Sequence, residues 1–181
     1  WIHRGKPTVL GAASGAIAGL VSITPAAGFV TPMASLFIGL IGGILCYFSV
    51  SLLKHKLGYD DSLDAFGCHG IGGIWGSLAT GLWATTSINS AGADGLFYGN
   101  PAQLGIQIVS IAATISLAVI ATIIILKVVG AFTPLRASSE EEETGLDLTM
   151  HGEEAYPDTH ERNLLPSPAL NLSSHKAIIN Q

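Results

Sequence analysis

One ionisable side chain, His69, lies inside a long apolar stretch of the sequence. Ionisable residues at membrane depth usually face the interior of a helix bundle or a cavity, and they mark ion or proton pathways. On a helix, the residues that share one face with this imidazole are Ala65, Gly73, Gly76 and Thr80, which are all small. The spacing therefore predicts a narrow space beside the His69 ring.

The His69 imidazole is suited to hydrogen-bond exchange. In its neutral form the ring offers one donor and one acceptor, so a small polar molecule that passes it is able to exchange hydrogen bonds with it. The alternative, which the residues leave open, is a structural histidine that hydrogen-bonds a neighbouring helix. A pathway residue is the interpretation that the apolar surroundings favour.

Other kinds of chemistry are poorly supported by the sequence. Cys68 is adjacent to His69 and so points to a different face of a helix, and Cys46 and Cys68 form no CxxC pair, so we expect no metal site, cofactor or disulfide framework. No Ser or Cys has a base partner at a motif spacing, which argues against an enzyme. Asp61 and Asp64 precede His69 and are interpreted as helix caps rather than substrate ligands.

The elements that position His69 are predicted to be membrane helices. Of the 181 residues, 49% are hydrophobic and 12% are charged, whereas a soluble domain carries roughly 25% charged residues. A membrane helix needs about 20 mostly apolar residues. The fold class that follows is all-α, a polytopic helix bundle over residues 1–136 with four spans, at residues 7–28, 31–53, 62–85 and 101–132.

The orientation of these spans follows from the basic residues. Lys and Arg precede the first span, separate the second from the third and follow the fourth, at Arg4, Lys6, Lys54, Lys56, Lys127 and Arg136. The other two connections, at residues 29–31 and 86–100, contain neither. The positive-inside rule then places both ends in the cytoplasm of a multi-pass cell-membrane protein.

The composition changes after Arg136. Most of the acidic residues lie beyond residue 139, and the net charge of −5 arises there, so nothing suggests a nucleic-acid surface. We interpret residues 137–156 as a cytoplasmic tail. Residues 157–181 mix Pro, Ser and Asn without helical period and are expected to be disordered.

Three segments in this order resemble the ammonium transporter (Amt/Rh) family. Residues 1–30 look like its signature, residues 60–70 are similar to the segment with the second histidine of its twin-histidine pore, and residues 145–147 and 151–153 are similar to its tail. The resemblance covers residues 1–156. It implies a carboxy-terminal part, the last four of eleven helices, of a homotrimer with one pore through each subunit.

The resemblance also implies the function and its residues. Ammonium loses its proton at an outer vestibule, and ammonia passes a hydrophobic pore, with methylammonium as an analogue. His69 would be the second pore histidine, Ile17 would line the pore from the first span, and Ala65 would lie one turn before His69. The alternatives are an ammonium sensor that signals through its tail, which the lack of a recognisable signalling domain disfavours, and an inactive fragment that begins at Trp1 and lacks the first pore histidine.

The resemblance further implies a regulatory tail. Its residues would be Gly145, Asp147, Thr149, His151 and Gly152. In plant relatives a threonine in this stretch is a phosphorylation switch, and a phosphate at Thr149 would add charge and strong acceptors. In bacterial relatives a PII-type signalling protein docks on the cytoplasmic face instead.

Overall fold

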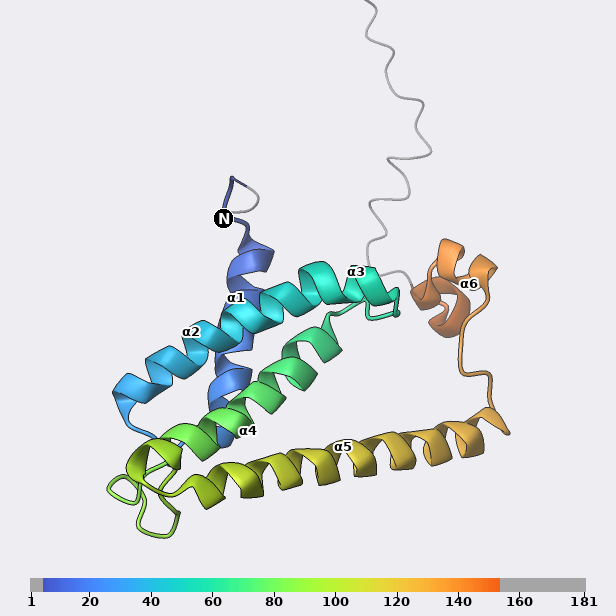
Figure 1. The fold of residues 1–181 in the computed structure, drawn as a ribbon. Helices are drawn as coiled ribbons and strands as arrows, with labels where there is room; N and C mark the ends of the chain where they lie inside the picture. Colours follow the sequence, from blue (N-terminus) through green and yellow to red (C-terminus); the bar gives the residue numbers. More distant parts are fainter. Residues whose placement is uncertain (1–4, 154–181) are drawn as a thin grey trace, which may run out of the picture. The chain divides into compact units, whose positions relative to one another are not determined.

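The structure is a computed structural model that describes residues 5–153, and every regular element in that range is helical. Figure 1 shows the ribbon. The α-helices are α1 (Val9–Ile23), α2 (Pro32–Phe48), α3 (Lys54–Leu57), α4 (Ile71–Trp83), α5 (Pro101–Gly130) and α6 (Ser139–Thr144). Short 3-10 turns cover Thr24–Ala26 and Leu96–Tyr98, and π-helical turns cover Ser49–Leu53, Phe66–Gly70 and Asp147–His151.

Local sequence explains where the first two long helices begin and end. Thr8 caps α1, because its hydroxyl accepts the Gly11 N–H at 3.0 Å, and Thr31 caps α2 just before Pro32. The helical run that starts at Pro32 continues through the Ser49–Leu53 turn to the end of α3. It stops at Gly58, whose left-handed φ of 63° is the usual helix terminator.

Three helices are long and apolar enough to cross a membrane, within residues 5–153. They cover Val9–Ala26, Pro32–Leu57 and Pro101–Gly130. These ranges fall on the spans predicted at 7–28, 31–53 and 101–132. The helix predicted at 62–85 is present but is not one of the three, because glycines and His69 dilute its apolar residues.

The start of that helix needs a correction. Residues 61–64 form a turn, in which the Asp64 N–H donates to the Asp61 carbonyl oxygen at 3.1 Å, and helical residues begin at Ala65 rather than at Ser62. Asp64 has a left-handed φ of 55°, which excludes it from a right-handed helix. An acidic cluster suggested the helix start, but the backbone turns there first.

The core lies where α1, α2 and α4 contact one another, as the blue, cyan and green ribbons of Figure 1 show. Its buried residues are mostly small: Ala26, Val30, Ala34, Ile38 and Ala79. Trp75 crosses from α4 and donates its indole N–H to the Ile38 carbonyl oxygen of α2 at 2.9 Å. Small residues let helix backbones approach closely in lipid, where there is little hydrophobic drive between helices.

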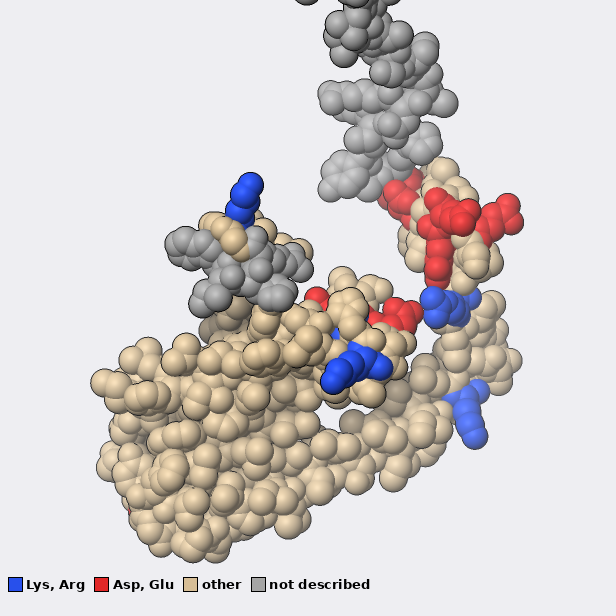
Figure 2. All heavy atoms as spheres, turned by 45° about the horizontal axis from the view of Figure 1, so that its top comes forward, with Lys and Arg blue, Asp and Glu red and all other residues tan. Residues whose placement is uncertain are grey.

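The chain divides into two compact units, residues 1–122 and 123–181. Figure 2 shows that the visible face of the first unit is largely uncharged, whereas acidic side chains gather on α6. In the second unit Ser138 and Glu141 form a capping box at the start of α6. The Arg136 Nε atom lies 3.5 Å from Glu142 Oε1. No residue of α5 is buried, although its apolar length suits a membrane.

Candidate functional site

His69 lies in the π-helical turn Phe66–Gly70, directly before α4. Its side chain is exposed in this chain, and so is that of Ala65. A Cβ added at Gly73 would meet no atom within 4 Å, whereas Gly76 and Thr80 are buried. The single small-residue face expected from helical spacing is therefore divided within α4, because Gly76 packs against Ser22 and Pro25 whereas Gly73 faces open space.

Ile17 is the site residue predicted on the first span. It lies on α1 and is 46% exposed, and α1 contacts the Phe66–Gly70 turn. Because Ile17, Ala65 and His69 are all exposed, this chain alone leaves the space beside the imidazole open. The narrow space predicted there would need another part of a protein to enclose it.

The Asp61 carboxylate holds the start of the His69 segment. One of its oxygens, Oδ1, accepts the Ala65 N–H at 2.8 Å, and the other accepts the Phe66 N–H at 2.9 Å. These are backbone donors without helical partners, which a capping side chain satisfies. The carboxylate thus fixes the first turn of the helix that carries the histidine.

Asp64 acts differently from Asp61. Its carboxylate accepts a hydrogen bond from Lys54 Nζ at 2.7 Å, and its backbone carbonyl accepts the Cys68 N–H at 3.0 Å. The Lys54 ammonium also donates to the Asp61 carbonyl oxygen. Sequence reasoning did not pair Lys54 with Asp64, since the turn that brings them together has no recognised spacing.

The two π-helical turns Ser49–Leu53 and Phe66–Gly70 contact each other. Gly67 in one turn approaches Val50 in the other so closely that an added Cβ would lie 2.6 Å from Val50 Cγ2. The Ser49 hydroxyl is buried nearby without a hydrogen-bond partner in the described part of the chain. Cys46 Sγ lies 3.6 Å from the Cys68 carbonyl oxygen. Within residues 5–153 no three His, Cys, Asp or Glu side chains are grouped to hold a metal ion.

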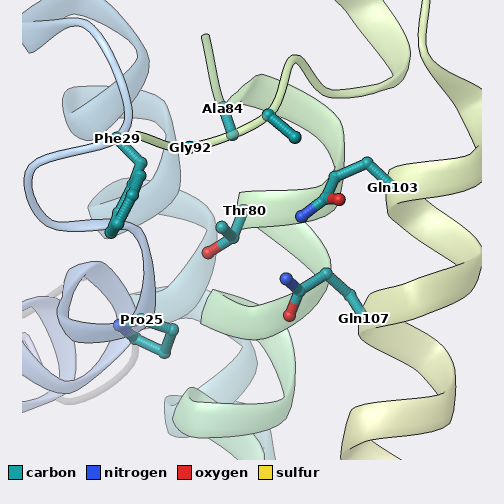
Figure 3. Close-up of a pocket in the computed structure, with 8 residues that line it drawn as sticks. Pro25, Phe29, Thr80, Ala84, Gly92, Gln103 and Gln107 are labelled. Carbon is teal, nitrogen blue, oxygen red and sulfur yellow. The ribbon is translucent and has the colours of Figure 1, made fainter. Parts of the chain in front are cut away.

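A cavity of about 180 Å³ lies near the other end of α4, between the end of the first helix, the loop after α4 and the start of α5 (Figure 3). Its lining residues are Pro25, Phe29, Thr80, Ala84, Gly92, Ala93, Gln103 and Gln107. Figure 3 shows the Gln103 and Gln107 amides directed from α5 toward Thr80. Sequence reasoning missed these amides, although two Gln residues one turn apart in an apolar helix were a readable signal.

The loop over this end of the bundle has one tightly held carboxylate. Asp94 accepts the Thr86 N–H at 2.7 Å and the Thr86 hydroxyl at 3.1 Å. The hydrogen bond from the Thr86 backbone holds the pKa of Asp94 below its ordinary value. This contact closes the loop between residues 86 and 94.

The predicted tail residues come together in one short turn. Asp147, Thr149 and His151 lie in the π-helical turn Asp147–His151, which Gly152 ends with a left-handed φ of 64°. The Thr149 hydroxyl is exposed and donates to the Gly145 carbonyl oxygen at 3.0 Å. The predicted tail beyond residue 153 and the disorder predicted at 157–181 lie outside the described residues.

Comparison with known proteins gives consistent similarities. The profile of the Ammonium Transporter Family matches residues 1–156. The chain is 66% identical over 159 residues to an ammonium transporter of Bacillus subtilis (strain 168), a match that covers 88% of this chain and 39% of that protein. It is 50% identical over 157 residues to ammonium transporter Amt1 of Archaeoglobus fulgidus, covering 86% of this chain and 39% of that protein.

The solved structures agree with the sequence matches. The crystal structure of Saccharomyces cerevisiae Mep2 resembles this chain with a TM-score of 0.69 and 36% sequence identity, over 77% of this chain and 32% of that one. Candida albicans Mep2 matches with the same TM-score and identity over 78% of this chain. The chain therefore spans less than half of the length of each of these relatives.

Proposed function

The chain belongs to the ammonium transporter family, and we propose on that premise that it helps to conduct ammonium or ammonia across a membrane. The observation that carries this proposal is His69, an ionisable side chain held by a fixed backbone beside apolar membrane helices. The 66% identity to a bacterial ammonium transporter supports it.

The proposed architecture extends beyond this chain. We infer that residues 1–136 form the last four of eleven membrane helices in a subunit, with α4 as the third of the four, and that subunits assemble as homotrimers. The share of the relatives that the chain spans, 39%, is compatible with that place. The exposed surface around Ile17, Ala65 and His69 would then be closed by the remaining helices, one of which would carry the partner histidine of a twin-histidine pore.

The physical chemistry of such a pore accounts for selectivity. An apolar pore penalises a bare cation by several kcal/mol. Ammonium escapes the penalty by giving up its proton, and the neutral molecule then exchanges hydrogen bonds with the His69 ring. Potassium has no proton to leave, so it is excluded without a cage of ligands. Methylammonium follows the same route as a substrate analogue.

We place the tail, residues 137–156, in the cytoplasm as a regulatory segment. The exposed Thr149 hydroxyl supports this, because a phosphate there would remove its hydrogen bond to Gly145 and add charge beside Asp147. A PII-type protein that docks on the cytoplasmic face is the second partner that the family suggests. Substitution of Thr149 tests regulation by phosphorylation.

The experiment that tests transport uses the full-length gene product purified into lipid vesicles. Labelled methylammonium should enter the vesicles when a methylammonium concentration gradient directed into them is imposed. Methylammonium binding without accumulation would identify a sensor instead, and neither binding nor accumulation would contradict the proposed function altogether.

A further inference from the structure

An ion pair joins α3 to the turn at residues 61–64, directly before the π-helical turn that carries His69, and we propose that Lys54 and Asp64 are positioning residues that fix His69 for conduction. This inference rests on the proposed function and names two residues that act through another. Neither side chain needs to touch the substrate.

Lys54 lies at the start of α3, at the end of the long helical run from Pro32. Its ammonium donates to the Asp64 carboxylate at 2.7 Å and to the Asp61 carbonyl oxygen. One cation therefore bridges both ends of the turn at residues 61–64. Only 25% of the Lys54 side chain and 38% of that of Asp64 are exposed, so solvent screens the pair less than it screens a surface ion pair.

The bridge continues into the backbone around His69. The Asp61 carboxylate accepts the Ala65 and Phe66 N–H groups, and the Asp64 carbonyl oxygen accepts the Cys68 N–H. Beyond Cys68, the Cys46 thiol contacts the Cys68 carbonyl oxygen. Cys68 is the residue before His69. Its N–H is thus held by the turn at residues 61–64, and its carbonyl oxygen is held by Cys46 of α2.

The identity of residue 64 supports a role for its charge. A left-handed φ of 55° is accessible to Gly and Asn as well as to Asp. The backbone conformation alone therefore does not require a carboxylate. The contact with Lys54 favours one, because a hydrogen bond between an ammonium and a carboxylate, here at 2.7 Å, adds the attraction of two opposite charges that an Asn amide would not supply.

The π-helical turn explains why the Lys54–Asp64 ion pair, which we call the clamp, matters. A π-helical turn leaves the regular hydrogen-bond ladder and occurs frequently at functional sites. The direction of the His69 side chain depends on this turn, and a misplacement of about 1 Å at a reacting group costs roughly a hundredfold in rate. A loosened turn would therefore reduce conduction before it reduced the amount of folded protein.

The test uses two single variants of the full-length protein, Lys54→Met and Asp64→Asn. Two quantities are measured in each. Hydrogen exchange of the amides at residues 65–70 should become about tenfold faster in both variants. Methylammonium uptake per folded transporter should fall about tenfold, while the concentration for half-maximal uptake stays the same, because the pore geometry rather than substrate capture has changed. Lys54→Arg keeps the charge and should recover much of the uptake.

Lys56→Met is the matched control, since Lys56 is an exposed lysine two residues further on and has no ion pair in residues 5–153. It should change neither measurement. Unchanged exchange in Lys54→Met would overturn the clamp, whatever the protein transports. Faster exchange with unchanged uptake would overturn the positioning role. Absence of uptake in the unaltered protein would contradict the proposed function, while the exchange data would still decide whether the clamp exists.

Discussion

Gly76 of α4 lies directly against the backbone carbonyl of Ser22 on α1, so closely that an added Cβ would collide with that oxygen. The same added Cβ would lie 2.8 Å from Cδ of the Pro25 ring. Neither a backbone carbonyl nor a proline ring moves aside easily. This contact sets how near α4, with the His69 turn before it, approaches α1, which carries Ile17.

We predict that Gly76→Ala destabilises the protein by about 1–3 kcal/mol, because the extra methyl group overpacks the contact between α1 and α4. Thermal unfolding of the purified protein measures the change. Gly15→Ala is the control, since a Cβ at Gly15 meets no atom within 4 Å in the described residues. Equal melting temperatures for Gly76→Ala and the unaltered protein would show that the two helices do not touch there.

Asp94 should give the loop at residues 86–94 a stability that depends on pH. Its pKa is lowered in the folded state, chiefly by the Thr86 N–H, so the contribution is present above the ordinary value of 3.8 and is lost as the pH falls through the lower folded value. Asp94→Asn should therefore melt below the unaltered protein at pH 6, and the difference should shrink at pH 3. A difference that is the same at both pH values would mean that the Asp94 charge is not the cause.

Thr149→Asp places a negative charge where the Thr149 hydroxyl donates to Gly145. If the tail regulates conduction through this site, methylammonium uptake should change at least about twofold in either direction at equal protein abundance. Thr149→Val removes the same hydrogen bond without adding charge and serves as the control. Uptake that is equal in Thr149→Asp and the unaltered protein would argue against a switch by phosphorylation.

The long helices could be predicted because their signal is local. Residues 7–53 contain no Asp, Glu, Lys, Arg or His, and the helices α1 and α2 with their flanking turns occupy most of that range. Pro32 and Pro101 also mark the first residues of α2 and α5, as proline at a first helical turn indicates.

The geometry around His69 could not be predicted in the same way. The face expected beside it includes Gly73 and Gly76, and packing of α4 against Ser22 and Pro25 buries Gly76 but leaves Gly73 open, which helical spacing alone does not reveal. The left-handed Asp64 and its pairing with Lys54 depend on contacts between segments ten residues apart. Capping by Asp61 is a local contact. The turn at residues 61–64 decides that Asp61, and not another nearby acid, accepts the backbone N–H groups.

The most direct test of the central claim is methylammonium uptake and transport current in the full-length protein with His69→Ala, measured in the same vesicles. His55→Ala is the matched control, because His55 is an exposed histidine on α3 and is not part of the π-helical turn at Phe66–Gly70. We predict that His69→Ala abolishes or alters conduction while His55→Ala leaves it unchanged. Uptake and current in His69→Ala equal to those of the unaltered protein would contradict a pore beside this histidine.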